Sequence, residues 1–356
     1  MLQFNPQTVK KLHRFREIKR GYYSFIALCA LLILSLFAEV LVNNRAIMVS
    51  YEGEVFFPTY TRFHPGTDFG LDYSYETNYR DLKAHFESNP ESGNWVIMPI
   101  VPYSPYENHA PGGVFKPAPP STSDSHYLGT DTTSRDILAR LVYGTRIALL
   151  FALAYMAAVY LIGITIGCAM GYFGGLFDLI FQRLIEIWSN IPFLYMVIIV
   201  FSVIPSTFSI PTRIMILLLV LVLFSWTGMT YYMRTETYKE KSRDYVAAAR
   251  TMGASDTRIV FSHILPNVLA TLVTFMPFTI VSAVTAITSL DFLGFGLPPP
   301  TPSLGELLKQ GTATLRTAPW IVTTAFTTLV VLLTLVTFIG EAVRESFDPK
   351  KFTVYQ

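Results

Sequence analysis

The chain has little charge for its length. Only 15% of its 356 residues are Asp, Glu, Lys or Arg, whereas soluble domains average about 25%. The net charge of +2 leaves no strong basic field, which argues against a nucleic-acid partner. With 51% hydrophobic residues and a mean hydropathy of +0.41, the composition indicates a membrane protein rather than a soluble or disordered one.

Cysteine and the common catalytic motifs are also scarce. The two cysteines, Cys29 and Cys168, both lie inside apolar runs, so neither a disulfide framework nor a cysteine zinc site is expected. The sequence contains no GxxxxGK[ST] phosphate loop and no GxSxG, HExxH or CxxC motif. We therefore expect no catalytic residues, no metal site and no cofactor bound by this chain.

Six stretches without an acidic or basic residue are present instead, each rich in Leu, Ile, Val, Phe and Ala. A helix needs about 20 apolar residues to cross the hydrocarbon core. A spanning segment must also satisfy its own backbone hydrogen bonds, which a helix does. The sequence thus predicts an all-α polytopic membrane protein with six transmembrane helices. The runs are 22–38 (extended to 43), 147–177, 187–212, 214–233, 264–290 and 317–340.

Basic residues outside these runs predict the orientation in the membrane. Residues 1–21 contain six Lys or Arg and one Glu, so this basic tail is expected in the cytoplasm. After six crossings the C-terminal tail, 343–356, is also cytoplasmic, as is the loop 234–266. A cleaved signal peptide is the rival interpretation of the N-terminal segment. Since no small-x-small site follows Ala38, we expect the first helix, 22–43, to stay uncleaved.

A long segment, 44–125, separates the first two predicted helices and is expected on the outer side. It contains ten acidic, five basic and fourteen aromatic residues. So many rings indicate a small folded unit, and the stretch 95–102 is predicted to be a strand or extended segment. A docking surface for a partner or a cationic substrate and a merely solubilising cap remain open alternatives.

Three glycines of the second predicted helix, Gly163, Gly167 and Gly171, are spaced four residues apart. This spacing places them on one helix face. Small residues on a membrane helix let a second helix approach closely. Helix packing inside the subunit is favoured over a contact between subunits.

The loop 234–266 has the most specific pattern. The segment DYVAAARTM, 244–252, predicts a helix because alanine is the strongest helix former, and Gly253 suits a left-handed stop. Ser255 is then expected to cap a second short helix that ends at Pro266. Two short helices that meet at a glycine suit insertion into a groove of another protein. An amphipathic hairpin on lipid headgroups is the alternative.

The run AAARTMG followed by ILP resembles the EAA loop of ABC importer permeases, whose pattern is EAA-x3-G, nine residues and I-x-L-P. Gly253 matches the glycine, Ala247 replaces the glutamate, and residues 264–266 match the end except for the spacing of the isoleucine. Three further stretches resemble oligopeptide/dipeptide (OppC/DppC-like) permeases. With its long insert, the chain is most similar to the Yej-type subset, which is associated with microcin C and peptide uptake. The stretches are HYLGTDTTSRDILARLVYGTRIA (126–148), FLGFGLPPPTPSLG (292–305) and GEAVRESFDPK (340–350).

This resemblance implies a type I ABC importer permease with a five-helix core, 126–342, and a periplasmic insert. It implies a heterodimer with a second permease subunit, two ATPase subunits or a fused tandem ATPase that bind ATP and Mg, and a periplasmic substrate-binding protein. The chain would lie in the bacterial inner membrane with both termini in the cytoplasm. The implied substrate is an oligopeptide or a microcin C-like peptide conjugate.

Several alternatives remain. A permease for another small solute such as nickel shares the family. A secondary transporter or channel would need an ionisable group at the membrane centre or a filter loop, and the sequence shows neither. An intramembrane enzyme would need a catalytic constellation, which the six runs also lack. A membrane-anchored scaffold would explain the segment 44–125 but not the pattern of the loop 234–266.

The loop pattern and the resemblance together place the surface that couples the chain to the ATPases on seven residues. Arg250 is expected to pair with an acidic residue of the ATPase, with a solvated helix charge as the alternative. The seven residues are Tyr245, Ala248, Ala249, Arg250, Met252, Gly253 and Ala254.

Overall fold

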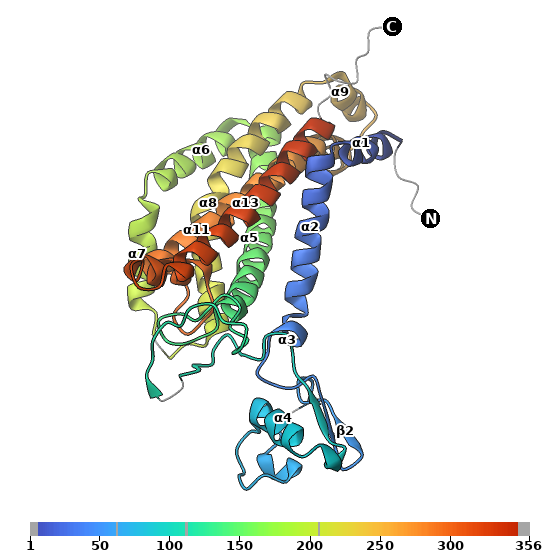
Figure 1. Ribbon diagram of the computed structural model, residues 1–356. Helices are drawn as coiled ribbons and strands as arrows, with labels where there is room; N and C mark the ends of the chain where they lie inside the picture. Colours follow the sequence, from blue (N-terminus) through green and yellow to red (C-terminus); the bar gives the residue numbers. More distant parts are fainter. Residues whose placement is uncertain (1–5, 62, 111–112, 206, 348–356) are drawn as a thin grey trace. The chain divides into compact units, whose positions relative to one another are not determined.

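The computed structural model describes residues 6–61, 63–110, 113–205 and 207–347. Most of them are helical (Figure 1). Within these residues five helices are long and apolar enough to cross a membrane, or six if a bent pair counts as one span. These elements are α2 (Lys19–Leu36), α5 (Ile137–Phe173), the pair α6 (Gly175–Ser189) and α7 (Phe193–Val203), α8 (Ile210–Lys241), α11 (Leu265–Leu293) and α13 (Pro319–Phe347).

The other elements are shorter; η1 and η2 are 3₁₀ turns and η4 is a π-helix. They are α1 (Pro6–Glu17), α3 (Ala38–Leu41), β1 (Met48–Tyr51), β2 (Glu54–Phe56), η1 (Gly66–Phe69), α4 (Tyr79–Ser88), η2 (Pro90–Ser92), β3 (Trp95–Ile97), α9 (Asp244–Thr251), α10 (Asp256–Arg258), η4 (Ile259–Ile264) and α12 (Leu304–Ala313).

The helix α5 begins ten residues before the start of the uncharged run 147–177 that predicted it, and it ends four residues before the end of that run. Its first turns include two arginines, which a search for uncharged residues leaves out. Both are paired: Arg146 Nη1 lies 2.8 Å from Glu39 Oε1, and Arg140 Nη2 lies 2.7 Å from Glu306 Oε2. The helix ends where the two glycines at 174–175 both take positive φ angles.

The third predicted span, 187–212, is not a single helix. The helices α6 and α7 are bent by 74° at a short break. Pro192 lies in this break; it lacks an N–H donor and disfavours helical conformation in the residue before it. The predicted run contains the last three residues of α6, all of α7 and the first three residues of α8.

The chain divides into two compact units. The hairpin unit comprises the residues up to 28, 149–287 and those from 332 onward, and the insert unit comprises 29–148 and 288–331. In the hairpin unit α6 packs against α5 and α8 around the buried side chains of Met170, Ile185 and Trp226.

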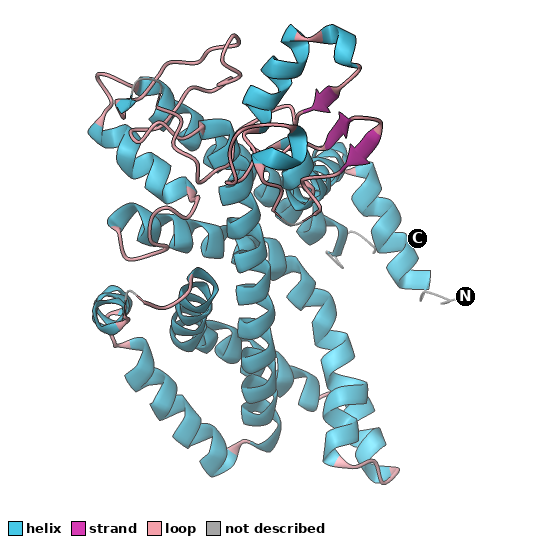
Figure 2. Cartoon of the chain, turned by 90° about the horizontal axis from the view of Figure 1, so that it is seen from below, coloured by secondary structure: helices cyan, strands magenta, loops and turns pink. Residues whose placement is uncertain are grey.

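In the insert unit, a three-stranded antiparallel sheet in the order β2–β1–β3 lies beside α4 (Figure 2). The strand predicted within 95–102 is confirmed as β3. Both residues of the turn 52–53 have positive φ angles, which is typical of a tight type I′ hairpin. Val49 and Val96 of the sheet form a buried core with Leu82 of α4, so this segment contains a folded unit.

Two stretches that carry the family resemblance, 126–148 and 292–305, meet in a buried ion network of the insert unit. The Arg140 guanidinium is fully buried and donates to the Glu306 carboxylate and to two backbone carbonyls of the second stretch. Asp131 is also fully buried and lies 3.5 Å from Arg140 Nε. An unpaired buried charge is very unfavourable, so these groups constrain one another's positions.

Truncation of Leu82 should destabilise the sheet and α4 selectively. Because the Leu82 side chain is fully buried, Leu82→Ala is expected to cost about 2–5 kcal/mol of unfolding free energy. Limited proteolysis of the full chain in detergent should then cut within 44–125 sooner than in the wild type. Ile100→Ala is the control, since Ile100 is 67% exposed. Equal cleavage of the two variants would contradict this core.

Candidate coupling site

The loop between α8 and α11 forms a helical hairpin (Figure 1). The helix α9 follows α8 after two residues. Ser255 then caps α10, and its hydroxyl accepts a hydrogen bond from the Arg258 N–H at 3.4 Å. The two short helices and the serine cap that the sequence predicts are therefore present.

Gly253 ends α9 in the left-handed conformation, with a φ of 82°. Its N–H donates to the Arg250 carbonyl at 3.0 Å, and the Ala254 N–H donates to the Ala249 carbonyl at 3.1 Å. These paired bonds are a Schellman motif, which satisfies carbonyls at the helix end. A Cβ built on Gly253 meets no described atom within 4 Å. Glycine is therefore favoured here by its conformational freedom rather than by lack of space.

The second short helix does not end at Pro266, and that prediction is wrong. The helix α10 continues through η4 into α11, which begins at Leu265. In a π-helix each backbone N–H donates to the carbonyl of the residue five positions earlier. Pro266 is the second residue of α11, directly after η4, and it has no N–H to donate. The hairpin is thus directly continuous with a spanning helix.

Four of the seven predicted coupling residues are exposed, and Met252 is 80% exposed. Tyr245 and Ala254 are half-buried. The Tyr245 hydroxyl donates to Glu240 Oε2 at 2.7 Å, and burial raises the pKa of this hydroxyl. The four exposed residues are Ala248, Arg250, Met252 and Gly253.

Ala249 is only 2% exposed, so its side chain faces into the chain, and its contact with the ATPases stays a prediction. It lies three residues after Val246, which is equally buried, and residues spaced by three share a helix face. This face points into the chain. Ala247, at the position of the family glutamate, lies on the exposed face instead.

Arg250 is bound within the chain. Its Nη2 donates to the Tyr172 hydroxyl at 3.0 Å, and that hydroxyl donates to Asp256 Oδ1 at 2.5 Å. The hydrogen bond with Tyr172 raises the pKa of Arg250. Sequence reasoning missed Tyr172, because it lies at the end of an apolar helix, 78 residues from its partner, and no local pattern marks it.

The three spaced glycines all face α8 of the same chain. A Cβ added at Gly167 would lie 2.5 Å from the Thr230 carbonyl oxygen. One added at Gly171 would lie 2.6 Å from the Arg234 carbonyl oxygen, and one at Gly163 would meet a side chain of α8 at the same distance. The helices α5 and α8 therefore approach more closely than any larger residue allows.

An ion pair fixes the neighbouring helix α6 to α8. Arg234 Nε and Nη2 lie 2.5 and 2.6 Å from the two carboxylate oxygens of Asp178. Asp178 is largely buried, so this bidentate pair is strongly directional. Among the described residues there is no group of three His, Cys, Asp or Glu arranged to hold a metal ion.

Residues 163–353 match the protein family described as "Binding-protein-dependent transport system inner membrane component". The chain belongs to this family. The matched region contains the three spaced glycines, the Asp178–Arg234 pair and the whole hairpin. The chain is thus an ABC transporter permease, a translocation subunit rather than an enzyme, as the sequence resemblance implied.

Individual permeases match over nearly the full length. The chain is 40% identical over 354 residues to "Inner membrane ABC transporter permease protein YejE" of Escherichia coli (strain K12), covering 99% of each chain. It is 39% identical over 371 residues to "Peptidoglycan transport system permease protein YejE" of Agrobacterium fabrum, covering 98% of this chain and 94% of that protein. "Dipeptide transport system permease protein DppC" of Haemophilus influenzae is 34% identical over 257 residues, covering 72% of this chain and 85% of that protein.

Replacement of Gly167, one of the three spaced glycines, should separate α5 from α8 in this permease. Because even a methyl group at Gly167 would collide with a backbone carbonyl, Gly167→Ala is expected to lower the unfolding free energy by about 1–3 kcal/mol. Gly228→Ala is the matched control, since a Cβ on this α8 glycine meets no described atom within 4 Å. Thermal unfolding of the purified chain in detergent measures the difference. Equal melting temperatures would contradict the close approach.

Proposed function

We propose that this permease is driven by separate ATPase subunits, which bind it at the hairpin 244–258. The observation that supports this most directly is that the hairpin follows α8 after two residues and continues without a break into α11. One face of α9 meanwhile stays exposed, with Ala247, Ala248 and Met252 uncovered. A face of small side chains suits a groove on a partner, and a continuous helix would transmit the movement of that partner.

The mechanism is alternating access. ATP binding would draw the two ATPases together, and the hairpin would tilt the spanning helices toward the outward-facing state. Hydrolysis would reset them. The ATPases favour one state only if their contacts with the hairpin differ between the two states. ATP and Mg²⁺ would be bound by the ATPases, and this chain would bind neither.

The proposed substrate is a peptide-containing solute. The names of two relatives specify peptidoglycan and dipeptide transport, and both of these substrates contain peptide bonds. A microcin C-like conjugate belongs to the same chemical class. Nickel serves as the comparison solute in the transport assay described below.

The remaining parts of the importer follow from the family. A second permease subunit would complete the pathway as a heterodimer, and a substrate-binding protein would deliver the peptide in the periplasm. The hairpin and both termini would be cytoplasmic, because the loop 234–266 that contains the hairpin and the N-terminal tail 1–21 each contain six Lys or Arg. The insert 44–125 lies one crossing away from the N-terminal tail and would be periplasmic.

A residue that resists the left-handed conformation at position 253 should uncouple transport. Gly253→Val is expected to abolish most peptide uptake while membrane insertion and expression stay normal, because a β-branched residue disfavours the φ of 82° found here. Gly253→Asn is the control, since asparagine tolerates this conformation, and it should retain most uptake. Normal uptake by the valine variant at normal expression would argue against this docking geometry.

Purification of the tagged permease in mild detergent should recover two ATPases and a second permease subunit. In proteoliposomes the complete complex, supplied with its binding protein, is expected to accumulate labelled peptide only when ATP is present. The permease alone should transport nothing. ATP-dependent accumulation of nickel but not of peptide would reject the proposed substrate. Uptake by the isolated chain would reject the dependence on ATPases.

A further inference from the structure

The hairpin has covalent connections to α8 and α11 but none to α5, the longest spanning helix. Movement of α9 reaches α5 only through non-covalent contacts. The polar contacts between them converge on Tyr172, the penultimate residue of α5, which is only 3% exposed.

The Tyr172 hydroxyl holds both helices of the hairpin. It accepts a hydrogen bond from Arg250 Nη2 at 3.0 Å and donates one to Asp256 Oδ1 at 2.5 Å. Arg250 belongs to α9 and Asp256 is the first residue of α10. Both partners are charged groups, which form stronger hydrogen bonds than neutral ones. A single oxygen atom therefore joins α5, α9 and α10.

The backbone of Tyr172 holds the end of α8 as well. Its carbonyl oxygen accepts from Lys241 Nζ at 2.5 Å. Carbonyls in the last turn of a helix have no partner within the helix, and a cation is favourable there. The Lys241 ammonium and the Arg250 guanidinium also lie 5.5 and 5.7 Å from the centre of the Tyr172 ring.

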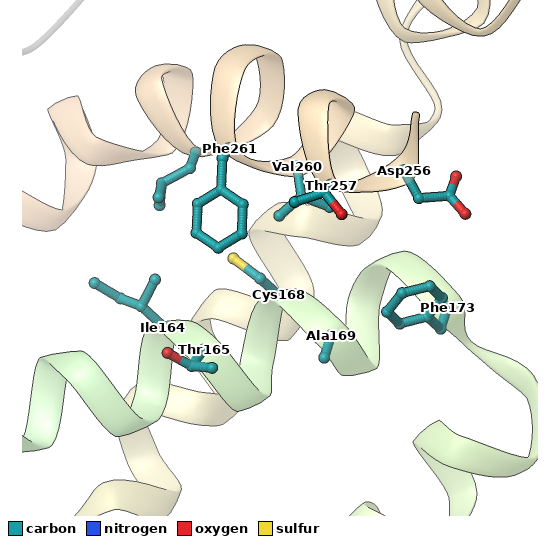
Figure 3. A pocket seen from close by; sticks show the side chains of 10 residues that line it. Ile164, Thr165, Cys168, Ala169, Phe173, Asp256, Thr257, Val260 and Phe261 are labelled. Carbon is teal, nitrogen blue, oxygen red and sulfur yellow. The ribbon is translucent and has the colours of Figure 1, made fainter. Parts of the chain in front are cut away.

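Apolar packing between α5 and the hairpin is incomplete beside this network (Figure 3). A cavity of about 210 Å³ lies between Cys168 and Ala169 of α5 and Val260 and Phe261 of η4. Side chains on either side of a void lose dispersion contacts. Beside this pocket, the hydrogen bonds of Tyr172 supply directional contacts between α5 and the hairpin.

We propose that Tyr172 is a positioning residue whose hydroxyl makes α5 move with the hairpin when the ATPases displace α9. This inference rests on the proposed function, since it requires α9 to be the element that the ATPases bind. The glycine contacts hold α5 to α8, and the Asp178–Arg234 pair holds α8 to α6. When the hairpin moves, α5, α6 and α8 therefore move with it.

Tyr172→Phe tests this role because it keeps the buried ring and removes only the hydroxyl. In the assembled importer in proteoliposomes, the ATPases should still co-purify and hydrolyse ATP. The number of peptides transported per ATP hydrolysed is expected to fall about tenfold, the factor that corresponds to the loss of one charge-assisted hydrogen bond. Tyr238→Phe on α8 is the matched control. Tyr238 is 53% exposed, and its hydroxyl makes no hydrogen bond among the described residues. The Tyr238→Phe variant should therefore transport as many peptides per ATP hydrolysed as the wild type.

A second variant shows whether the loss acts through the shared bond. Asp256→Ala removes the other end of the same hydrogen bond and should lower the ratio similarly. The double variant Tyr172→Phe with Asp256→Ala should have the same transport-to-ATP ratio as the more impaired single variant. The effects of two mutations that remove the same interaction do not add. Additive losses would overturn the shared role.

Two further outcomes would also overturn it. If Tyr172→Phe keeps the wild-type ratio while Gly253→Val lowers it, the positioning role fails and the coupling hairpin stands. If both variants keep the wild-type ratio, the hairpin is not the coupling element and both proposals fail. Loss of the ATPases from purified Tyr172→Phe would show a role in assembly and would likewise reject positioning.

Discussion

The close approach of α5 and α8 is the constraint on which the rest of the hairpin unit depends. At Gly167 and Gly171 the space that a Cβ would need is already occupied by backbone oxygens of α8. In a membrane, helices gain little from the hydrophobic effect when they associate, so such close packing is a main source of their affinity. The approach also sets the relative register of the two helices. It brings the end of α5, with Tyr172, beside the end of α8, with Lys241.

Several charged groups on the long helices have partners of opposite charge. Arg234 pairs with Asp178, and Arg146 pairs with Glu39. In the insert unit Arg140, which is fully buried, pairs with Glu306. A charge is costly in a membrane or a protein interior unless a partner compensates it. These pairs allow α5 to extend beyond the uncharged stretch of its sequence and still remain one helix.

The hairpin combines a rigid turn with an incompletely packed attachment. The Schellman bonds at Gly253 and the serine cap at Ser255 define the angle between α9 and α10. The π-helix η4 then joins the hairpin to α11 without a break. Beside η4 lies a pocket of about 210 Å³, while hydrogen bonds to Tyr172 hold the hairpin to α5. Such an element is suited to transmit movement through a few directional contacts, which is what a permease driven by external ATPases requires.

The sequence by itself determined the membrane class, the approximate number of spans, the two-helix hairpin and its glycine stop. These features depend on local chemistry: apolar runs long enough for a bilayer, alanine-rich helix and a residue that tolerates positive φ. The motifs of the resemblance were sufficient to identify the permease family. Only the tertiary structure decided that Ala249 faces inward, that the helix passes through Pro266 and that the third span is broken at Pro192. It also decided that Tyr172 joins the hairpin to α5, because that contact forms between residues 78 and 84 positions apart, and a linear sequence contains no local signal for a contact made by folding.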